Sequence, residues 1–204
     1  MTTIKNVIFD LGNVLLDIDY SKTIEAFEAL GFKNFKTDFA PQAMGVLFQQ
    51  LETGKITEDH FYQNIKAINN TVISNTQIKN AWNALLLNFR TESLATLEKM
   101  ALQYQLFLFS NTNSIHLTAF EEIFTRDTGK PSLDDYFTKS YYSNIIGYRK
   151  PDIAAFEFVI KDAAIEPSAT LFIDDLEVNI EGAKKAGIKT HLLLPHERIE
   201  DLQL

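Results

Sequence analysis

The sequence contains no cysteine, so it forms no disulfide bond and offers no thiolate as a metal ligand or nucleophile. Basic residues are also few: 19 Lys and Arg stand against 27 Asp and Glu, for a formal net charge of -8. Without a basic stripe, nucleic acid and an anionic membrane are poor candidate partners. No apolar run is long enough to span a bilayer, and no basic leader precedes the first strand. The sequence therefore predicts a cytoplasmic protein without a nucleic-acid or membrane partner.

What the chain does contain is a regular alternation of short apolar segments and amphipathic segments. Its 204 residues are 46% hydrophobic, enough for one domain with a sizeable core and an insert. Strands are predicted at residues 6–9, 106–109, 136–142, 170–173 and 189–194, with helices between most of them. This alternation favours right-handed crossovers. It predicts the α/β class, with a Rossmann-like parallel sheet flanked by helices on both faces.

One long segment interrupts the alternation. Residues 18–90 contain four stretches with helical spacing, at about 21–30, 39–51, 57–68 and 76–89. Ser21 is the expected N-cap of the first, and Gly31 is expected to end it. The sequence therefore predicts a helical subdomain at 18–90, inserted into an α/β core formed by residues 1–17 and 91–204.

Polar residues follow three of the predicted strands directly. Asp10 ends the first strand, Ser110 and Asn111 follow the second, and Asp174 and Asp175 follow another. Lys150 precedes a helix and can join them, because strand ends in open α/β sheets gather ligands. Each residue alone also fits a helix cap or a surface charge. Together they supply a carboxylate nucleophile, ligands for Mg²⁺, groups for phosphate oxygens and a fixed cation, as phosphoryl transfer requires.

The segments FDLGNVL, FSNTN, GYRKPD and FIDDLEVN, which start at residues 9, 109, 147 and 172, resemble motifs one to four of the haloacid dehalogenase-like (HAD) hydrolases. The first and third are especially similar to those of bacterial sugar phosphatases of the α-D-glucose-1-phosphate phosphatase type. The resemblance covers the whole chain and implies that residues 18–90 are the family's α-helical cap. It implies a Mg²⁺-dependent phosphatase of small phosphorylated metabolites, with sugar phosphates favoured.

Carried over residue by residue, the resemblance makes Asp10 the nucleophile and gives Lys150 the task of holding it and the transferring phosphoryl group. Ser110 and the Asn111 region would bind phosphate oxygens. Asn179 would orient the paired aspartates. The implied Mg²⁺ ligands are Asp10, Asp174, Asp175 and the backbone carbonyl of Gly12.

Gly12 also marks a departure from the family, because most of its phosphatases carry an aspartate there as general acid and base. Loss of such a group typically lowers the rate by about 10²–10⁴. The rate falls least for esters whose leaving group departs with little protonation. The sequence therefore predicts a bias towards anomeric 1-phosphates or similarly activated esters.

Two alternatives remain open. A 2-haloacid dehalogenase also uses an aspartate nucleophile, although that chemistry has no need for the paired Asp174 and Asp175. A catalytically weak phosphate-binding or regulatory module would keep the site but lack turnover, in keeping with Gly12. Among other residues, Tyr20 and the turn at 52–54 are candidates to face the cleft. His116 follows Ser110 closely enough to line the pocket, although a position at the surface or at a helix cap is favoured.

Overall fold

A five-stranded parallel sheet lies at the centre of the computed structural model, which describes residues 3–33, 41–68 and 72–202. The strand order is β5-β4-β1-β6-β7. All five strands coincide with or overlap the segments that the sequence predicts. They are β1 (Asn6–Phe9), β4 (Gln105–Ser110), β5 (Lys139–Tyr142), β6 (Thr170–Asp174) and β7 (Lys189–Leu192).

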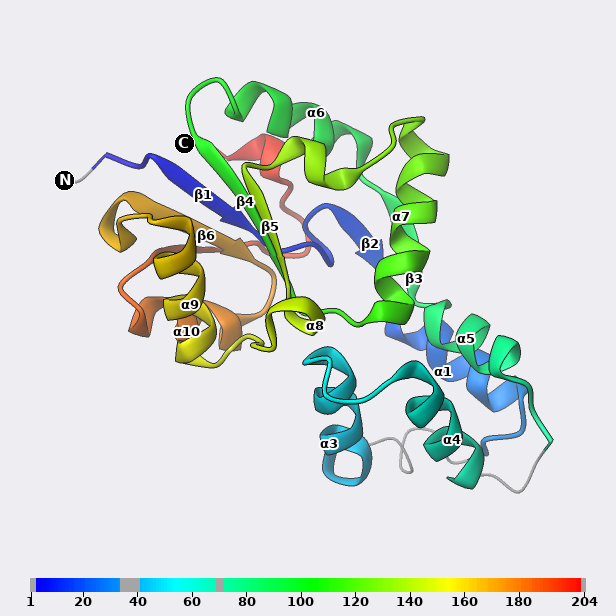
Figure 1. Ribbon diagram of the computed structural model, residues 1–204. Coiled ribbons are helices and arrows are strands. Elements are labelled where there is room, and N and C mark those ends of the chain that lie inside the picture. The colour runs from blue at the N-terminus through cyan, green and yellow to red at the C-terminus, as the bar shows by residue number, and fades with distance from the viewer. Residues whose placement is uncertain (1–2, 34–40, 69–71, 203–204) are drawn as a thin grey trace.

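Helices cover both faces of this sheet, as Figure 1 shows. One face is covered by α6 (Thr91–Met100) and α7 (Ser114–Thr128), and the other by α9 (Ile153–Ala163) and α10 (Glu177–Lys185). The short helix α8 (Ser143–Ile146) follows β5. Three 3₁₀ turns, at Leu133–Tyr136, Pro167–Ala169 and Ile199–Asp201, complete the connections.

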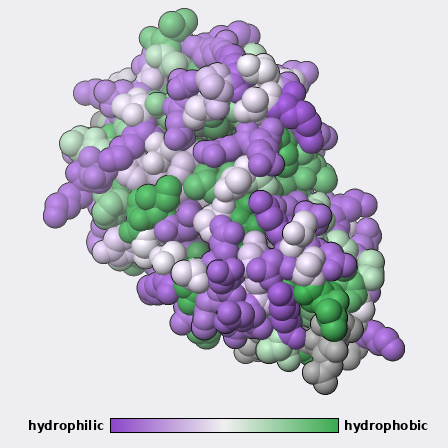
Figure 2. Space-filling model, turned by 45° about the vertical axis from the view of Figure 1, so that its right-hand side comes forward, coloured by the Kyte–Doolittle hydropathy of each residue, from purple (hydrophilic) through white to green (hydrophobic). Residues whose placement is uncertain are grey.

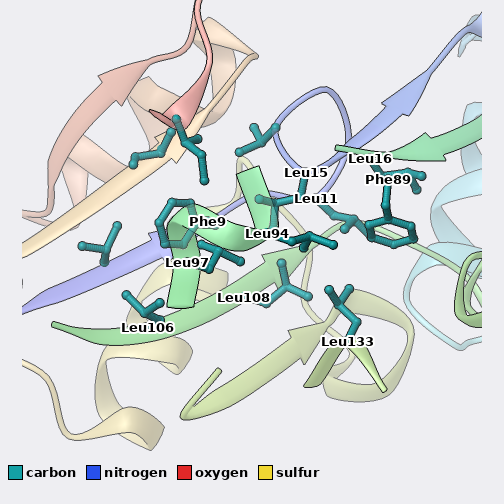
Figure 3. Close-up of a cluster of buried hydrophobic side chains, with 14 of the residues drawn as sticks. Phe9, Leu11, Leu15, Leu16, Phe89, Leu94, Leu97, Leu106, Leu108 and Leu133 are labelled. Carbon is teal, nitrogen blue, oxygen red and sulfur yellow. The ribbon is translucent and has the colours of Figure 1, made fainter. Parts of the chain in front are cut away.

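The central strand β1 explains why the sheet has two hydrophobic cores. Successive side chains of a strand point to opposite faces. Val7 and Phe9 therefore pack with α6 and α7, whereas Ile8 packs with α9 and α10. Figure 3 shows the first of these cores, where Leu94 and Leu97 of α6 lie against Phe9. Because every β1 side chain is buried, the strand and the carboxylate that follows it are held firmly.

The insert forms a helical block of α1 (Tyr20–Ala29), α3 (Pro41–Glu52), α4 (Glu58–Ile68) and α5 (Asn75–Asn83), beside the strand ends in Figure 1. The block has its own buried core, which includes Phe27, Phe61 and Ile78 and also Ile115 from α7. The helical interpretation therefore holds for most of the segment. The boundaries at residues 18 and 90 stay a prediction.

Two sequence-based expectations in this region are wrong. The helix predicted for 76–89 ends at Asn83, and Leu86–Phe89 forms a strand, β3, antiparallel to β2 (Leu16–Ile18). A short apolar run does not by its spacing distinguish strand from helix, and here the pairing with β2 decides. The N-cap of α1 is Asp19 rather than Ser21, because the Asp19 carboxylate accepts a hydrogen bond from the Ser21 N–H. Positions 39 and 40 of the predicted helix 39–51 lie outside the described residues.

Polar side chains cover most of the molecular face in Figure 2, with smaller hydrophobic areas between them. No helix within the described parts of the chain is long and apolar enough to cross a membrane.

Candidate active site

The polar strand ends meet at one edge of the sheet. β1 pairs with β4 on one side and with β6 on the other, so Asp10, Ser110 and Asp174 lie at neighbouring carboxyl ends. The Asp10 N–H donates to the Ile173 carbonyl at 2.9 Å, which extends the sheet pairing by one residue. The structure therefore brings these three residues together, as the sequence predicts.

Lys150 joins this group from the loop before α9, although it is far away in the sequence. Its Nζ lies 2.6 Å from Asp10 Oδ1 and 2.7 Å from Asp174 Oδ2. Only 1% of its side chain is exposed. Burial alone would lower its pKa, but the two carboxylates outweigh burial and raise the pKa, so the ammonium stays charged.

The Asn111 side chain fixes the backbone of Lys150. Asn111 Oδ1 accepts from the Lys150 N–H at 2.9 Å, and Asn111 Nδ2 donates to the Lys150 carbonyl at 2.8 Å. The Asn111 amide is therefore engaged in positioning the lysine. Motif spacing did not reveal this contact, because it joins positions 39 residues apart.

Asp10 is almost completely buried, and burial raises its pKa to about 7. The neighbouring Lys150 opposes this rise, whereas Asp174 adds to it. Without a metal ion, the protonated form of Asp10 is therefore more favoured than in an exposed aspartate. A cation placed beside it would favour the ionised form.

The paired aspartates differ in their surroundings. Both oxygens of Asp174 accept hydrogen bonds, from Leu176 N–H, from Asn179 Nδ2 and from Lys150 Nζ. Asp175 is less buried and accepts from Asn13 Nδ2 at 3.1 Å. Burial raises the pKa of Asp175, and the Asn13 hydrogen bond opposes the rise. Sequence reasoning missed Asn13, a residue with φ of 55°, although its place in a strand-to-loop turn was a signal.

Carboxylate oxygens of Asp10, Asp174 and Asp175 lie within 4.8 Å of one another. Two oxygens on opposite sides of an octahedral Mg²⁺ are about 4.2 Å apart. The all-oxygen donors suit magnesium by their chemistry, and their spacing is close to the one that the ion requires. Asp10 and Asp175 are the better placed ligands, since both oxygens of Asp174 already accept hydrogen bonds, whereas Lys150 contacts one oxygen of Asp10.

A cavity of about 300 Å³ lies between this edge of the sheet and the helical block. Hydrophobic side chains form most of its wall, and Ser110 and Asn111 also contribute. Gly12 reaches the same cavity, where a Cβ would lie 2.9 Å from Ile18 Cδ1. Ser110 and Asn111, which are predicted to bind phosphate, therefore line a space that can hold a small substrate.

His116 lies in the wall of this cavity, the less favoured of the two sequence-based expectations for this residue. Its ring stacks on Trp82 with centroids 5.2 Å apart. Nδ1 lies 3.0 Å from Asn113 Nδ2, a donor, and Nε2 lies 3.1 Å from the Trp82 carbonyl, an acceptor. These partners fit the neutral ring protonated on Nε2. Burial lowers the pKa of His116 to about 4, so the ring is uncharged at neutral pH.

The fold and the site define an α/β protein with a carboxylate–lysine centre at the carboxyl ends of its parallel strands. The haloacid dehalogenase-like hydrolase family model matches residues 4–187. The chain belongs to this family of hydrolases.

Three matches with known proteins and structures support this assignment. The D-ribitol-5-phosphate phosphatase of Bacteroides thetaiotaomicron is 35% identical over 188 residues, which cover 92% of this chain and 90% of that protein. A crystal structure of a HAD family enzyme from the same organism, in complex with magnesium and inorganic phosphate, superimposes with a TM-score of 0.88 at 35% identity. It covers 98% of this chain and 100% of that chain. A HAD-like family hydrolase from Porphyromonas gingivalis is 30% identical, with a TM-score of 0.85 and coverage of 96% and 94%.

Proposed function

We propose that this chain is a magnesium-dependent phosphatase of small sugar or polyol phosphates, with Asp10 as the nucleophile. The observation that carries the proposal is the buried ammonium of Lys150, which contacts Asp10 and Asp174 beside a third carboxylate. The relative that is a D-ribitol-5-phosphate phosphatase supports the substrate class. That relative is named for a primary phosphate ester, so the bias towards anomeric esters stays a prediction.

In the proposed first step, a carboxylate oxygen of Asp10 attacks phosphorus, and the bond from phosphorus to the sugar oxygen breaks. An aspartyl-phosphate forms on Asp10, and the departing oxygen takes up a proton from water. Lys150 holds the carboxylate in place and stabilises charge on the phosphoryl oxygens. Water then attacks the phosphorus of the aspartyl-phosphate, which frees the Asp10 carboxylate and releases inorganic phosphate.

Asp10 and Asp175, with the Gly12 carbonyl, would hold Mg²⁺, and Asn179 would keep Asp174 oriented. When bound, the ion supplies positive charge that favours ionised Asp10 and offsets the charge of the phosphate dianion. The Ser110 hydroxyl would donate a hydrogen bond to a phosphate oxygen. The helical block, taken as residues 18–90, would act as the cap that excludes water from the reacting groups.

The proposal is tested by measuring phosphate release from ribitol 5-phosphate, glucose 1-phosphate, glucose 6-phosphate and an aryl phosphate, with and without Mg²⁺. Asp10→Asn removes the nucleophile, and Asp135→Asn, at an exposed position, is the matched control. We expect Mg²⁺-dependent release by the wild type and by Asp135→Asn, and none by Asp10→Asn.

Other outcomes would point to the two alternatives. Mg²⁺ binding without release from any ester would favour the binding module. Chloride release from a 2-haloacid, independent of Mg²⁺, would favour the dehalogenase. Full activity of Asp10→Asn would show that a different residue is the nucleophile.

A further inference from the structure

Glu52, the last residue of α3, places a carboxylate in the wall of the cavity beside the proposed centre. Among the described residues that line this cavity it is the one acidic side chain, and none of them is lysine or arginine. The catalytic cation, Lys150, lies outside the cavity lining, at the phosphate end of the site. The space left for the leaving group therefore contains one negative group.

Arg149 holds this carboxylate from the side away from the cavity. Arg149 Nε lies 2.9 Å from Glu52 Oε2, and the two side chains are 27% and 28% exposed. Arg149 lines a separate surface cavity with Gln49 and Tyr148 and is not among the residues that line the substrate space. Burial raises the pKa of Glu52, and Arg149 opposes the rise, which favours the ionised carboxylate.

The turn after Glu52 keeps its position fixed. Gly54 has φ of 65° and packs so closely on α8 that a Cβ there would collide with the Asn144 carbonyl oxygen. A side chain at this position would push the turn away from the core. Because the turn packs on α8 and the ion pair lies beside it, the Glu52 carboxylate is fixed relative to Lys150.

The other polar groups of the cavity supply no positive charge. His116 is neutral, with both nitrogens already paired, and the Thr23 hydroxyl donates to the Trp82 carbonyl at 3.2 Å. A hydroxyl of the substrate can donate to the free oxygen of Glu52. A carboxylate or second phosphate in the same place would lose water and lie next to a like charge that Arg149 only partly offsets, which is unfavourable.

We propose that Glu52, held by Arg149, makes the site selective for phosphate esters whose leaving group carries hydroxyls and no negative charge. The inference rests on the proposed phosphatase function and assigns its specificity to one residue. Discrimination of this kind works by a repulsive element as well as an attractive one.

The test compares two esters that differ in one terminal group. Ribitol 5-phosphate ends in CH₂OH, and 5-phosphoribonate carries a carboxylate in its place, while the scissile ester is the same. kcat/KM is measured for both, at saturating Mg²⁺, in the wild type, Glu52→Gln, Glu52→Asp and Glu28→Gln. Glu52→Gln removes the charge at almost constant shape, Glu52→Asp keeps it, and Glu28→Gln removes a charge from the exposed side of α1.

We expect the wild type, Glu52→Asp and Glu28→Gln to prefer ribitol 5-phosphate. In Glu52→Gln this preference should fall by about tenfold or more, mainly through faster hydrolysis of 5-phosphoribonate. An equal loss of activity on both esters in Glu52→Gln would assign Glu52 a merely structural role and overturn the inference. A wild type that hydrolyses both esters equally well would overturn it without any variant. A wild type that releases no phosphate from any ester would instead overturn the proposed function itself.

Discussion

Replacing Asp10 with asparagine is expected to stabilise the metal-free protein above neutral pH, although it removes the proposed nucleophile. Burial raises the pKa of Asp10 from 3.8 to about 7, against the opposing effect of Lys150. A carboxyl group with a raised pKa binds its proton more tightly in the folded than in the unfolded chain. Stability is therefore lost as pH rises from about 4 to about 7, and the full penalty applies above pH 7.

The pKa rise from 3.8 to about 7 corresponds to roughly 4 kcal/mol against the ionised folded form. Asparagine avoids this cost but gives up the charge-assisted hydrogen bond that Lys150 Nζ makes to Asp10 at 2.6 Å. Lys150 keeps Asp174 as its partner, so no buried charge is left unpaired. We therefore expect Asp10→Asn to raise the free energy of unfolding by about 1–3 kcal/mol at pH 8.

Urea unfolding in the presence of a chelator measures this difference at pH 8 and pH 4. The gain should nearly disappear at pH 4, where Asp10 is protonated in the folded wild type, and Asp135→Asn should show no such gain. Saturating Mg²⁺ should shrink the gap, because it stabilises the wild type more than a variant lacking one carboxylate. Equal or lower stability of Asp10→Asn at pH 8 would refute the electrostatic reasoning.

Two further predictions concern residues next to the centre. Gly12→Asp is expected to be tolerated, because its Cβ meets only the flexible end of Ile18. By supplying the missing acid it should raise kcat/KM for glucose 6-phosphate relative to an aryl phosphate by about tenfold or more; an unchanged ratio would contradict the leaving-group argument. Asn179→Ala removes both hydrogen bonds from Asn179 to Asp174, which holds Lys150 against the metal ligand Asp10, and is expected to weaken Mg²⁺ binding by about 10–100-fold. A Mg²⁺ titration of activity measures this effect, with exposed Val178→Ala as control, and equal Mg²⁺ affinity in both variants would show that Asn179 does not support the metal site.

The sheet and the strand-end residues were predictable because they depend on local patterns. β1 and β6 are short apolar runs that end in aspartates, and the topology of parallel strands brings such ends together. The β2–β3 pair was not predictable, because Leu86–Phe89 reads equally well as the end of a helix. The contacts of Asn13 with Asp175 and of His116 with Trp82 were also not predictable, since each depends on a partner brought close only by folding.

The pairing of Glu52 with Arg149 was likewise not predictable from the sequence. It bears on how a substrate would enter the site. At one end of the site, Lys150 supplies one positive charge to three carboxyl groups, so the centre carries two excess negative charges when all three are ionised. A divalent cation would restore the balance, so a phosphate dianion is attracted there only once the metal is bound. At the other end, Glu52 repels anions and accepts hydrogen bonds from hydroxyls. This charge distribution would orient a sugar phosphate with its phosphoryl group towards Asp10 before any contact with the reacting atoms is made.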